Sequence, residues 1–110
     1  FNPHLIPSFR GILSSIYINK KKGVSTNKII KTLKLFYKSD YFIKIYKQNS
    51  QIGTGNVINT NNCDISVCQT RIKDKIVIFS AIDNLVKGAA GQAIQNMNNL
   101  FNFNVSLGLK

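Results

Sequence analysis

Residues 83–98 read DNLVKGAAGQAIQNMN, and this stretch decides how the end of the chain is built. The spacing of its apolar residues predicts a helix over about 85–101. This helix keeps two interior glycines, Gly88 and Gly91, and each costs about 1 kcal/mol of stability relative to alanine. The presence of both glycines indicates that the helix backbone lies close to another helix, a second subunit or a cofactor.

Two side-chain stripes run along this predicted helix, which Asp83 or Asn84 is expected to cap. The apolar stripe consists of Val86, Ala90, Ala93, Met97, Leu100 and Phe101. The second stripe, small and then polar, consists of Gly88, Gly91, Gln92, Gln95 and Asn99. In one interpretation the apolar stripe is core and the second packs on a helix or subunit. In the other, the helix start lies near a bound nucleotide, since its amides favour anionic groups.

Upstream of this helix, β-branched residues and apolar alternation predict strands, and apolar residues three or four apart predict one more helix. The expected strands are 11–19, 41–46, 57–58, 64–70 and 75–82, the last two forming a hairpin. The expected helix is 26–38, with Ser25 as its cap. This order predicts an α+β fold, with helices packed on a mostly antiparallel or mixed sheet.

The chain carries 15 Lys and Arg against 4 Asp and Glu, a formal net charge of +11. Such charge can attract nucleic acid, but Arg, which reads guanine directly, contributes only 2 of the 15 basic residues. The lysines are spread through every element, as a Lys/Asn/Ile-rich composition would place them. We therefore expect no nucleic-acid partner. No apolar run approaches the roughly 20 residues of a membrane helix, so we expect no membrane partner either.

The chain has two cysteines, Cys63 and Cys68, and a single histidine. A zinc site needs about four ligands, so we expect no metal. The cysteines are five residues apart on a predicted strand, so their side chains point to opposite faces. We expect free thiols and a cytoplasmic protein.

The single histidine, His4, lies between Pro3 and Pro7, which restrict the backbone. An imidazole suits acid/base chemistry near neutral pH, and Arg10 offers a planar fork for a carboxylate or phosphate. From spacing alone, an incidental surface histidine is the favoured interpretation of His4. No G-x-G-x-x-G phosphate turn is found, so we expect no complete dinucleotide-binding domain within this chain.

Short motifs stand in a fixed order along the chain. They are Pro3-His4-Leu5 with Pro7, Arg10-Gly11-Ile12-Leu13, Lys22-Gly23-Val24, Asn62-Cys63-Asp64-Ile65, Ala81-Ile82-Asp83-Asn84-Leu85 and Lys87-Gly88-Ala89-Ala90-Gly91-Gln92-Ala93. In this order they resemble the N-acetyl-gamma-glutamyl-phosphate reductase family over nearly the whole chain. Aspartate-semialdehyde dehydrogenase has a similar final helix, but Gly91-Gln92 and residues 95–98 favour the former family.

The resemblance implies an NADP-dependent oxidoreductase of arginine biosynthesis. N-acetylglutamyl 5-phosphate, an acyl phosphate, is reduced with NADPH to the semialdehyde and phosphate is released. The family's cysteine nucleophile, which forms a thioester, belongs to the segment upstream of Phe1, and Cys63 matches a different position. By the same resemblance His4 is the catalytic acid/base, Arg10 binds the substrate, and Asn84 and Gly88 lie near the cofactor.

The resemblance also implies a glyceraldehyde-3-phosphate-dehydrogenase-like C-terminal domain and a homo-oligomer, either dimer or tetramer. Residues 1–83 would be the catalytic and dimerisation part, and residues 84–110 a helix and tail that pack on a nucleotide-binding domain upstream. We accordingly expect the small-residue face at Gly88 and Gly91 to be partly uncovered, and this chain alone to be inactive. An aspartate-semialdehyde dehydrogenase-type enzyme and a non-catalytic dimerisation module remain the alternatives.

Overall fold

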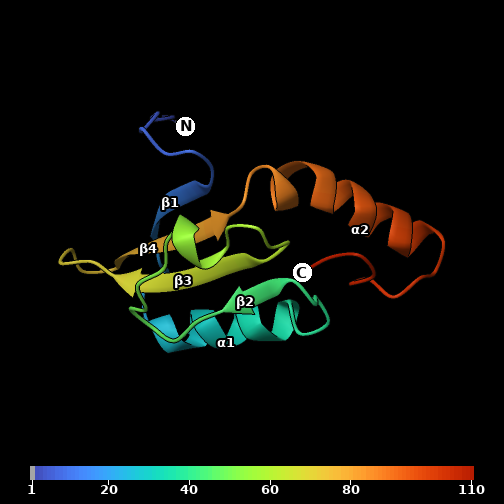
Figure 1. Ribbon diagram of the computed structural model, residues 1–110. Helices are drawn as coiled ribbons and strands as arrows, with labels where there is room; N and C mark the ends of the chain where they lie inside the picture. Colours follow the sequence, from blue (N-terminus) through green and yellow to red (C-terminus); the bar gives the residue numbers. More distant parts are fainter. Residues whose placement is uncertain (1) are drawn as a thin grey trace.

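The computed structural model describes residues 2–110 and shows a four-stranded sheet with one helix packed below it and another extending from its end (Figure 1). The elements are β1 (Ile12–Asn19), α1 (Thr26–Phe36), β2 (Ile43–Ile45), η1 (Thr54–Asn56), β3 (Cys63–Gln69), β4 (Lys75–Ile82), η2 (Val86–Ala90) and α2 (Gly91–Leu100). The strand order is β1-β4-β3-β2, with β2 parallel to β3 and the other pairs antiparallel. The predicted α+β fold with a mixed sheet is confirmed.

The core lies between α1 and one face of the sheet. Ile30 of α1 packs against Val67 of β3 and Ile76 of β4, both fully buried. The helix begins as expected, because the Ser25 side chain accepts a hydrogen bond from the Lys28 N–H at 3.1 Å. The apolar face of α1 thus fixes which side of the sheet is covered by a helix.

The loop after β2 covers the opposite face of the sheet. Ser66 donates a hydrogen bond to the carbonyl of Ser50 at 2.7 Å, and the Tyr46 hydroxyl donates to Asp64 at 2.9 Å. The expected strand 57–58 is wrong. Its N–H groups bond locally to the carbonyl of Thr54, at 3.1 and 3.2 Å, so this stretch forms a turn after η1.

The two cysteines are free, as expected, and both are half-buried. Their sulfur atoms have different neighbours: Cys63 lies 3.4 Å from the Ser80 hydroxyl, and Cys68 lies 3.6 Å from the Ser66 hydroxyl. Adjacent strand positions alternate between faces, so an odd separation of five places the two thiols on opposite sides of the sheet.

The last predicted helix is present, but it begins with a π-helical turn. The Gly88 N–H bonds to the Asp83 carbonyl at 3.1 Å and the Ala90 N–H to the Leu85 carbonyl at 3.4 Å, both five residues back. From Gly91 onward the helix is α-helical. Such π-turns are rare and occur frequently at functional sites.

The interpretation that put the apolar stripe of this helix in the core is wrong for the described chain. Met97, Leu100 and Phe101 are 46%, 76% and 61% exposed. The polar side faces inward instead, because the tail after α2 returns along it. The Asn98 side chain donates to the carbonyls of Val105 and Leu107.

The expectation for the two glycines holds for one and fails for the other. Gly88 is exposed, whereas Gly91 is buried. A Cβ on residue 91 would collide with Asn61 and would lie 2.7 Å from Val86 Cγ1. Gly91 is therefore required by packing within this chain. No helix of residues 2–110 is both long and apolar enough to cross a membrane.

We expect Gly91→Ala to destabilise the protein by about 1–3 kcal/mol, the usual cost of overpacking. A Cβ there would also lie 2.8 Å from the Val86 carbonyl oxygen, which cannot move without disturbing the helix. Gly88→Ala is the matched control, because a Cβ there meets nothing closer than 3.6 Å, and it should be neutral or stabilising by up to about 1 kcal/mol. Urea unfolding measures both, and equal stabilities would contradict this packing account.

Candidate active site

The predicted site residues lie mostly at one end of the sheet. β1 and β4 are antiparallel with Ile12 opposite Ile82, so the chain just before β1 and the chain just after β4 are neighbours. The N-terminal segment therefore rises beside the connection from β4 into the last helix (Figure 1). Residues that are more than seventy positions apart in sequence meet here.

One carboxylate, that of Asp83, organises this junction and is fully buried. Its Oδ1 accepts hydrogen bonds from Arg10 Nε at 3.1 Å and Nη2 at 2.9 Å, and from the N–H groups of Leu85 at 2.9 Å and Val86 at 3.2 Å. Its Oδ2 accepts from the Asn59 N–H at 2.7 Å and lies 2.7 Å from Arg10 Nη2. The carboxylate thus joins three separate segments and is satisfied on both oxygens.

The charge state of Asp83 follows from these contacts. Burial by itself would raise the pKa of this carboxyl, but the hydrogen bonds from Arg10 and from the N–H groups of Asn59, Leu85 and Val86 hold its pKa below the ordinary value of 3.8. Asp83 is therefore ionised at neutral pH and forms a charge-assisted pair with the guanidinium.

Asn84 makes a second link across the same junction. Its side-chain oxygen accepts a hydrogen bond from the Gly11 N–H at 2.7 Å. Gly11 has a φ of +107°, and a Cβ there would lie 2.5 Å from Thr54 Cβ, so only glycine fits this turn. Of the two expected caps, Asp83 bonds the N–H groups at the helix start, while Asn84 ties the N-terminal segment down.

Gly88 lies beside Asn84 on an exposed face of the π-turn. A Cβ on Gly88 would stand 3.6 Å from Ile82 Cδ1 and 3.7 Å from Asn84 Cβ, which are ordinary contacts. Packing within residues 2–110 therefore does not demand glycine at this position. The backbone at Gly88 is exposed to solvent.

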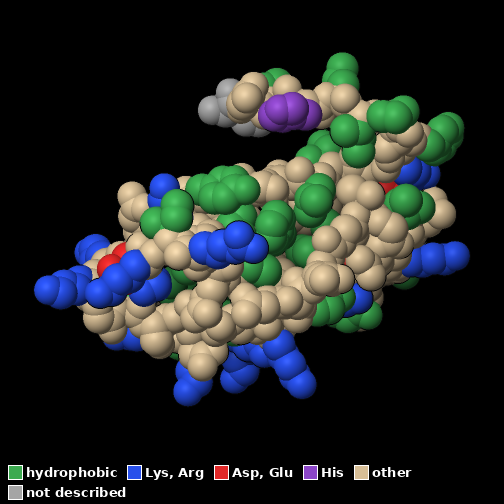
Figure 2. Space-filling model, turned by 90° about the vertical axis from the view of Figure 1, so that its left-hand side faces the viewer, with side chains coloured by type: hydrophobic (Ala, Val, Ile, Leu, Met, Phe, Trp, Pro, Cys, Tyr) green, Lys and Arg blue, Asp and Glu red, His purple; other side chains and the backbone are tan. Residues whose placement is uncertain are grey.

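His4 is exposed and lies on the N-terminal segment, away from the body of the domain, where Figure 2 shows the chain's single imidazole in purple. Within residues 2–110 no hydrogen bond holds this imidazole. The structure thus brings Arg10, Asn84 and Gly88 to one junction but leaves His4 on the segment that the junction anchors.

The sequence did not predict the hydrogen-bond partners of the Arg10 side chain. Its fork is engaged, because Nε and Nη2 bind Asp83 and Nη1 donates to the Asn59 side chain at 3.1 Å, leaving the Arg10 side chain 17% exposed. No local pattern signals these partners, which lie 49 and 73 residues away.

Lys87 was also missed. Burial lowers its pKa, its ammonium lies 5.5 Å above the Phe42 ring, and it donates to Gln95 at 2.8 Å. Gln95 in turn accepts from the Asn61 side chain at 2.8 Å. These contacts hold the helix start against the end of the sheet.

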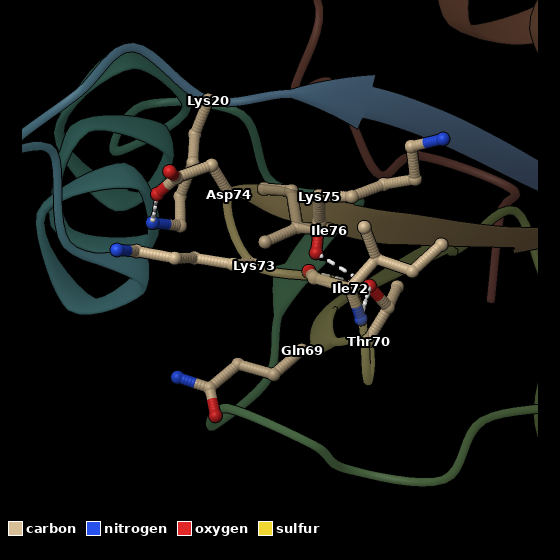
Figure 3. Close-up of a pocket in the computed structure, with 8 residues that line it drawn as sticks. All are labelled: Lys20, Gln69, Thr70, Ile72, Lys73, Asp74, Lys75 and Ile76. Carbon is tan, nitrogen blue, oxygen red and sulfur yellow. Dashed lines mark hydrogen bonds and ion pairs between the residues drawn. The ribbon is translucent and has the colours of Figure 1, made fainter.

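A separate hollow of about 210 Å³ lies at the far end of the sheet, where Asn19 pairs with Lys75 (Figure 3). It is ringed by lysines, but Lys20 is paired with Asp74 at 2.8 Å, and Thr70 donates to the Lys75 carbonyl at 2.8 Å. The hollow is therefore a feature of the hairpin and is unconnected to the junction. Within residues 2–110, no three His, Cys, Asp or Glu side chains are grouped as metal ligands.

Comparison with known protein families identifies the class of this α+β domain. The model of the family described as "Semialdehyde dehydrogenase, dimerisation domain" matches residues 1–84. The chain belongs to this family, and its relatives are reductases.

Among the similar proteins, the N-acetyl-gamma-glutamyl-phosphate reductase of Clostridium botulinum (strain Eklund 17B / Type B) is 46% identical over 109 residues, which are 99% of this chain and 32% of the relative. The enzymes of that name from Halothermothrix orenii and Staphylococcus aureus (strain MRSA252) are 44% and 41% identical over 110 residues, all of this chain and 32% of each relative. The resemblance drawn from the motifs is confirmed. The chain spans about a third of the length of these relatives.

We expect the ion pair at Asp83 to make the protein less stable in acid. Because the pKa of folded Asp83 is lowered below 3.8, the pair contributes fully above that value and is lost as the pH falls through the folded pKa. Asp83→Asn should cost about 2–4 kcal/mol at pH 7, somewhat less than for a fully enclosed pair because Arg10 touches solvent.

Urea unfolding at a series of pH values measures this effect. The difference in free energy of unfolding between wild type and Asp83→Asn should shrink as the pH falls below about 4. Asp74→Asn, which breaks the exposed pair with Lys20, is the control and should change stability much less. A wild-type to Asp83→Asn difference that is the same at all pH values would contradict the assignment.

Proposed function

We propose that this chain is the C-terminal part of an NADP-dependent reductase of arginine biosynthesis. The enzyme converts N-acetylglutamyl 5-phosphate and NADPH to N-acetylglutamate 5-semialdehyde, phosphate and NADP⁺. The observation that carries the proposal is 41–46% identity over essentially the whole chain to reductases of that name. The junction that brings Arg10 close to Asn84 and Gly88 is compatible with the roles that the resemblance gives these residues.

The roles of the chain's own residues follow from their positions. His4 is the acid/base group, and its exposure leaves both ring nitrogens open to a substrate. Arg10 presents its remaining exposed edge to an anionic group of the substrate. The nucleophilic cysteine, which forms the thioester as phosphate leaves, lies in the part of the enzyme that precedes this chain. Cys63 is not that group, since it lies half-buried within the sheet.

Asn84 and Gly88 border the cofactor. Gly88 is exposed and its missing Cβ is not needed by internal packing, which fits the close approach of a large planar or phosphorylated group. The Asn84 side-chain oxygen accepts from the Gly11 N–H, and within residues 2–110 its amide nitrogen has no partner, so this donor is free to bind the cofactor. When bound, NADPH supplies the hydride for the reduction.

Exposed apolar surface supports assembly into a larger, oligomeric enzyme. The edge strand β1 exposes apolar side chains on both faces, which are Ile12, Leu13, Ile16, Tyr17 and Ile18. Figure 2 shows hydrophobic side chains gathered across this side of the molecule. Soluble proteins cover such edges and patches. We propose that a second subunit and the preceding part of the enzyme cover them, giving a cytoplasmic dimer or tetramer without nucleic-acid or membrane partners.

The exposed stripe of α2, with Met97, Leu100 and Phe101, is proposed to pack on the nucleotide-binding domain. Residues 84–110 would then bridge the two parts of the enzyme, while residues 1–83 form the catalytic and dimerisation part. Phe1, the first residue of that part, lies outside the described residues.

We expect His4→Ala in the full-length enzyme to lower turnover by about 10²–10⁴-fold, the usual contribution of a general acid or base. Steady-state assays with N-acetylglutamyl 5-phosphate measure it, with Asp74→Asn, at the far end of the sheet, as the control. Unchanged turnover in His4→Ala would favour a non-catalytic dimerisation module or a different acid. Faster reduction of aspartyl phosphate by wild type would favour an aspartate-semialdehyde dehydrogenase-type enzyme.

We expect these 110 residues, expressed alone, to form no semialdehyde from NADPH and either acyl phosphate. They contain no G-x-G-x-x-G phosphate turn, and Cys63 and Cys68 are both committed to the sheet. NADPH consumption is the measurement, with the full-length enzyme as the positive control. Sustained turnover by the isolated chain would overturn the proposed division of the active site.

A further inference from the structure

The N-terminal segment has few ties to the rest of the domain. Residues 2–9 are all exposed, and Leu5 and Phe9 are 103% and 94% exposed. Within residues 2–110, the hydrogen bonds of residues 2–9 are local, from Ser8 N–H to the Ile6 carbonyl and from the Ser8 hydroxyl to the Arg10 carbonyl. The anchors of the segment on the body of the domain are the Arg10 side chain and the Gly11 N–H.

Both anchors end on consecutive residues at the start of the last helix. Arg10 binds the carboxylate of Asp83, and the Gly11 N–H binds the side chain of Asn84. The same Asp83 carboxylate holds the Asn59 N–H, and the Asn59 side chain returns to Arg10 Nη1. The direction in which the segment leaves the domain is therefore set by a closed ring of contacts among Arg10, Asn59 and Asp83.

We propose that Asp83 is a positioning residue for the reaction. It fixes the segment that carries His4 relative to the helix start that carries Asn84 and Gly88. Asp83 is fully buried and touches no substrate, so it acts through Arg10. The inference rests on the proposed function, because the role of Asp83 is to hold His4 in line with Asn84 and Gly88, which border the cofactor in that proposal. Small misplacements of a reacting group cost large factors in rate.

The mildest test loosens the ring without disturbing the backbone. Asn59 has a φ of +61°, a conformation that glycine adopts freely, so Asn59→Gly removes only the side-chain acceptor for Arg10. Asn49→Gly is the matched control, because Asn49 has a φ of 59° and its side chain accepts the Gln69 N–H far from the junction. Asp83→Asn is the stronger variant, and Asn59→Gly carries the test if Asp83→Asn fails to fold.

The experiment measures turnover of the full-length enzyme in two backgrounds, wild type and His4→Ala. With His4 present, we expect turnover to fall at least threefold in Asn59→Gly and about tenfold or more in Asp83→Asn. With His4→Ala, both factors should shrink to less than about twofold, because changes that act through one group are not additive. Asn49→Gly should leave turnover unchanged in both backgrounds. Equal factors in the two backgrounds would show that Asn59 and Asp83 act independently of His4, through overall structure or through the substrate contact of Arg10, and would overturn the proposal.

Hydrogen–deuterium exchange separates this proposal from the proposed function. Exchange of the Gly11 N–H, which is bonded to the Asn84 side chain, should quicken in Asn59→Gly and Asp83→Asn, while exchange in α1 stays unchanged. If wild type reduces no acyl phosphate yet exchange quickens, the proposed function fails and the anchoring by Asp83 stands. If His4→Ala lowers turnover but exchange of the Gly11 N–H in Asn59→Gly and Asp83→Asn stays as in wild type, the proposed function stands and the role of Asp83 is refuted.

Discussion

The ion pair between Asp83 and Arg10 is the constraint on which the rest of this end of the molecule depends. Removing a carboxylate from water is costly, and the cost is offset only when strong donors surround it. Here a guanidinium fork and three backbone N–H groups, from Asn59, Leu85 and Val86, supply those donors. Because the donors come from three segments, satisfying one buried charge also decides where β1 starts, how the loop closes and where the last helix begins.

Asp83 also takes part in the π-helical turn at the start of the last helix. The π-turn bonds the Gly88 N–H to the Asp83 carbonyl, one residue further back than an α-turn would. This leaves Gly88 exposed while Gly91 is pressed against Asn61. The two glycines therefore differ: packing within the chain requires glycine at residue 91, whereas residue 88 is exposed and internal packing does not require glycine there.

The sequence predicted the regular elements well where a local period dominates. Lys75–Ile82 was bounded correctly because β-branched residues are dense there, and Ser25 capped its helix as expected. The strand predicted at Val57-Ile58 was wrong because two apolar residues are too few to show a period. In the structure, the N–H groups of both residues are bonded within a local turn. The Arg10–Asp83 contact could not be predicted, because no local pattern links residues 73 positions apart. The roles that the ordered motifs give Arg10, Asn84 and Gly88 stay predictions.

The orientation of α2, with its apolar side outward, could not be predicted for the same reason, because it depends on contacts between residues far apart in sequence. The sequence alone does not show that the tail would return to bond its last residue, Lys110, to the Asn61 N–H. With the tail on the polar side of α2, the apolar side must face outward. The chain spans about a third of the length of its relatives. The outward stripe of α2 and the open edge of β1 are apolar surfaces of the kind that proteins usually cover, and this supports the proposal that further parts of a larger protein pack on them.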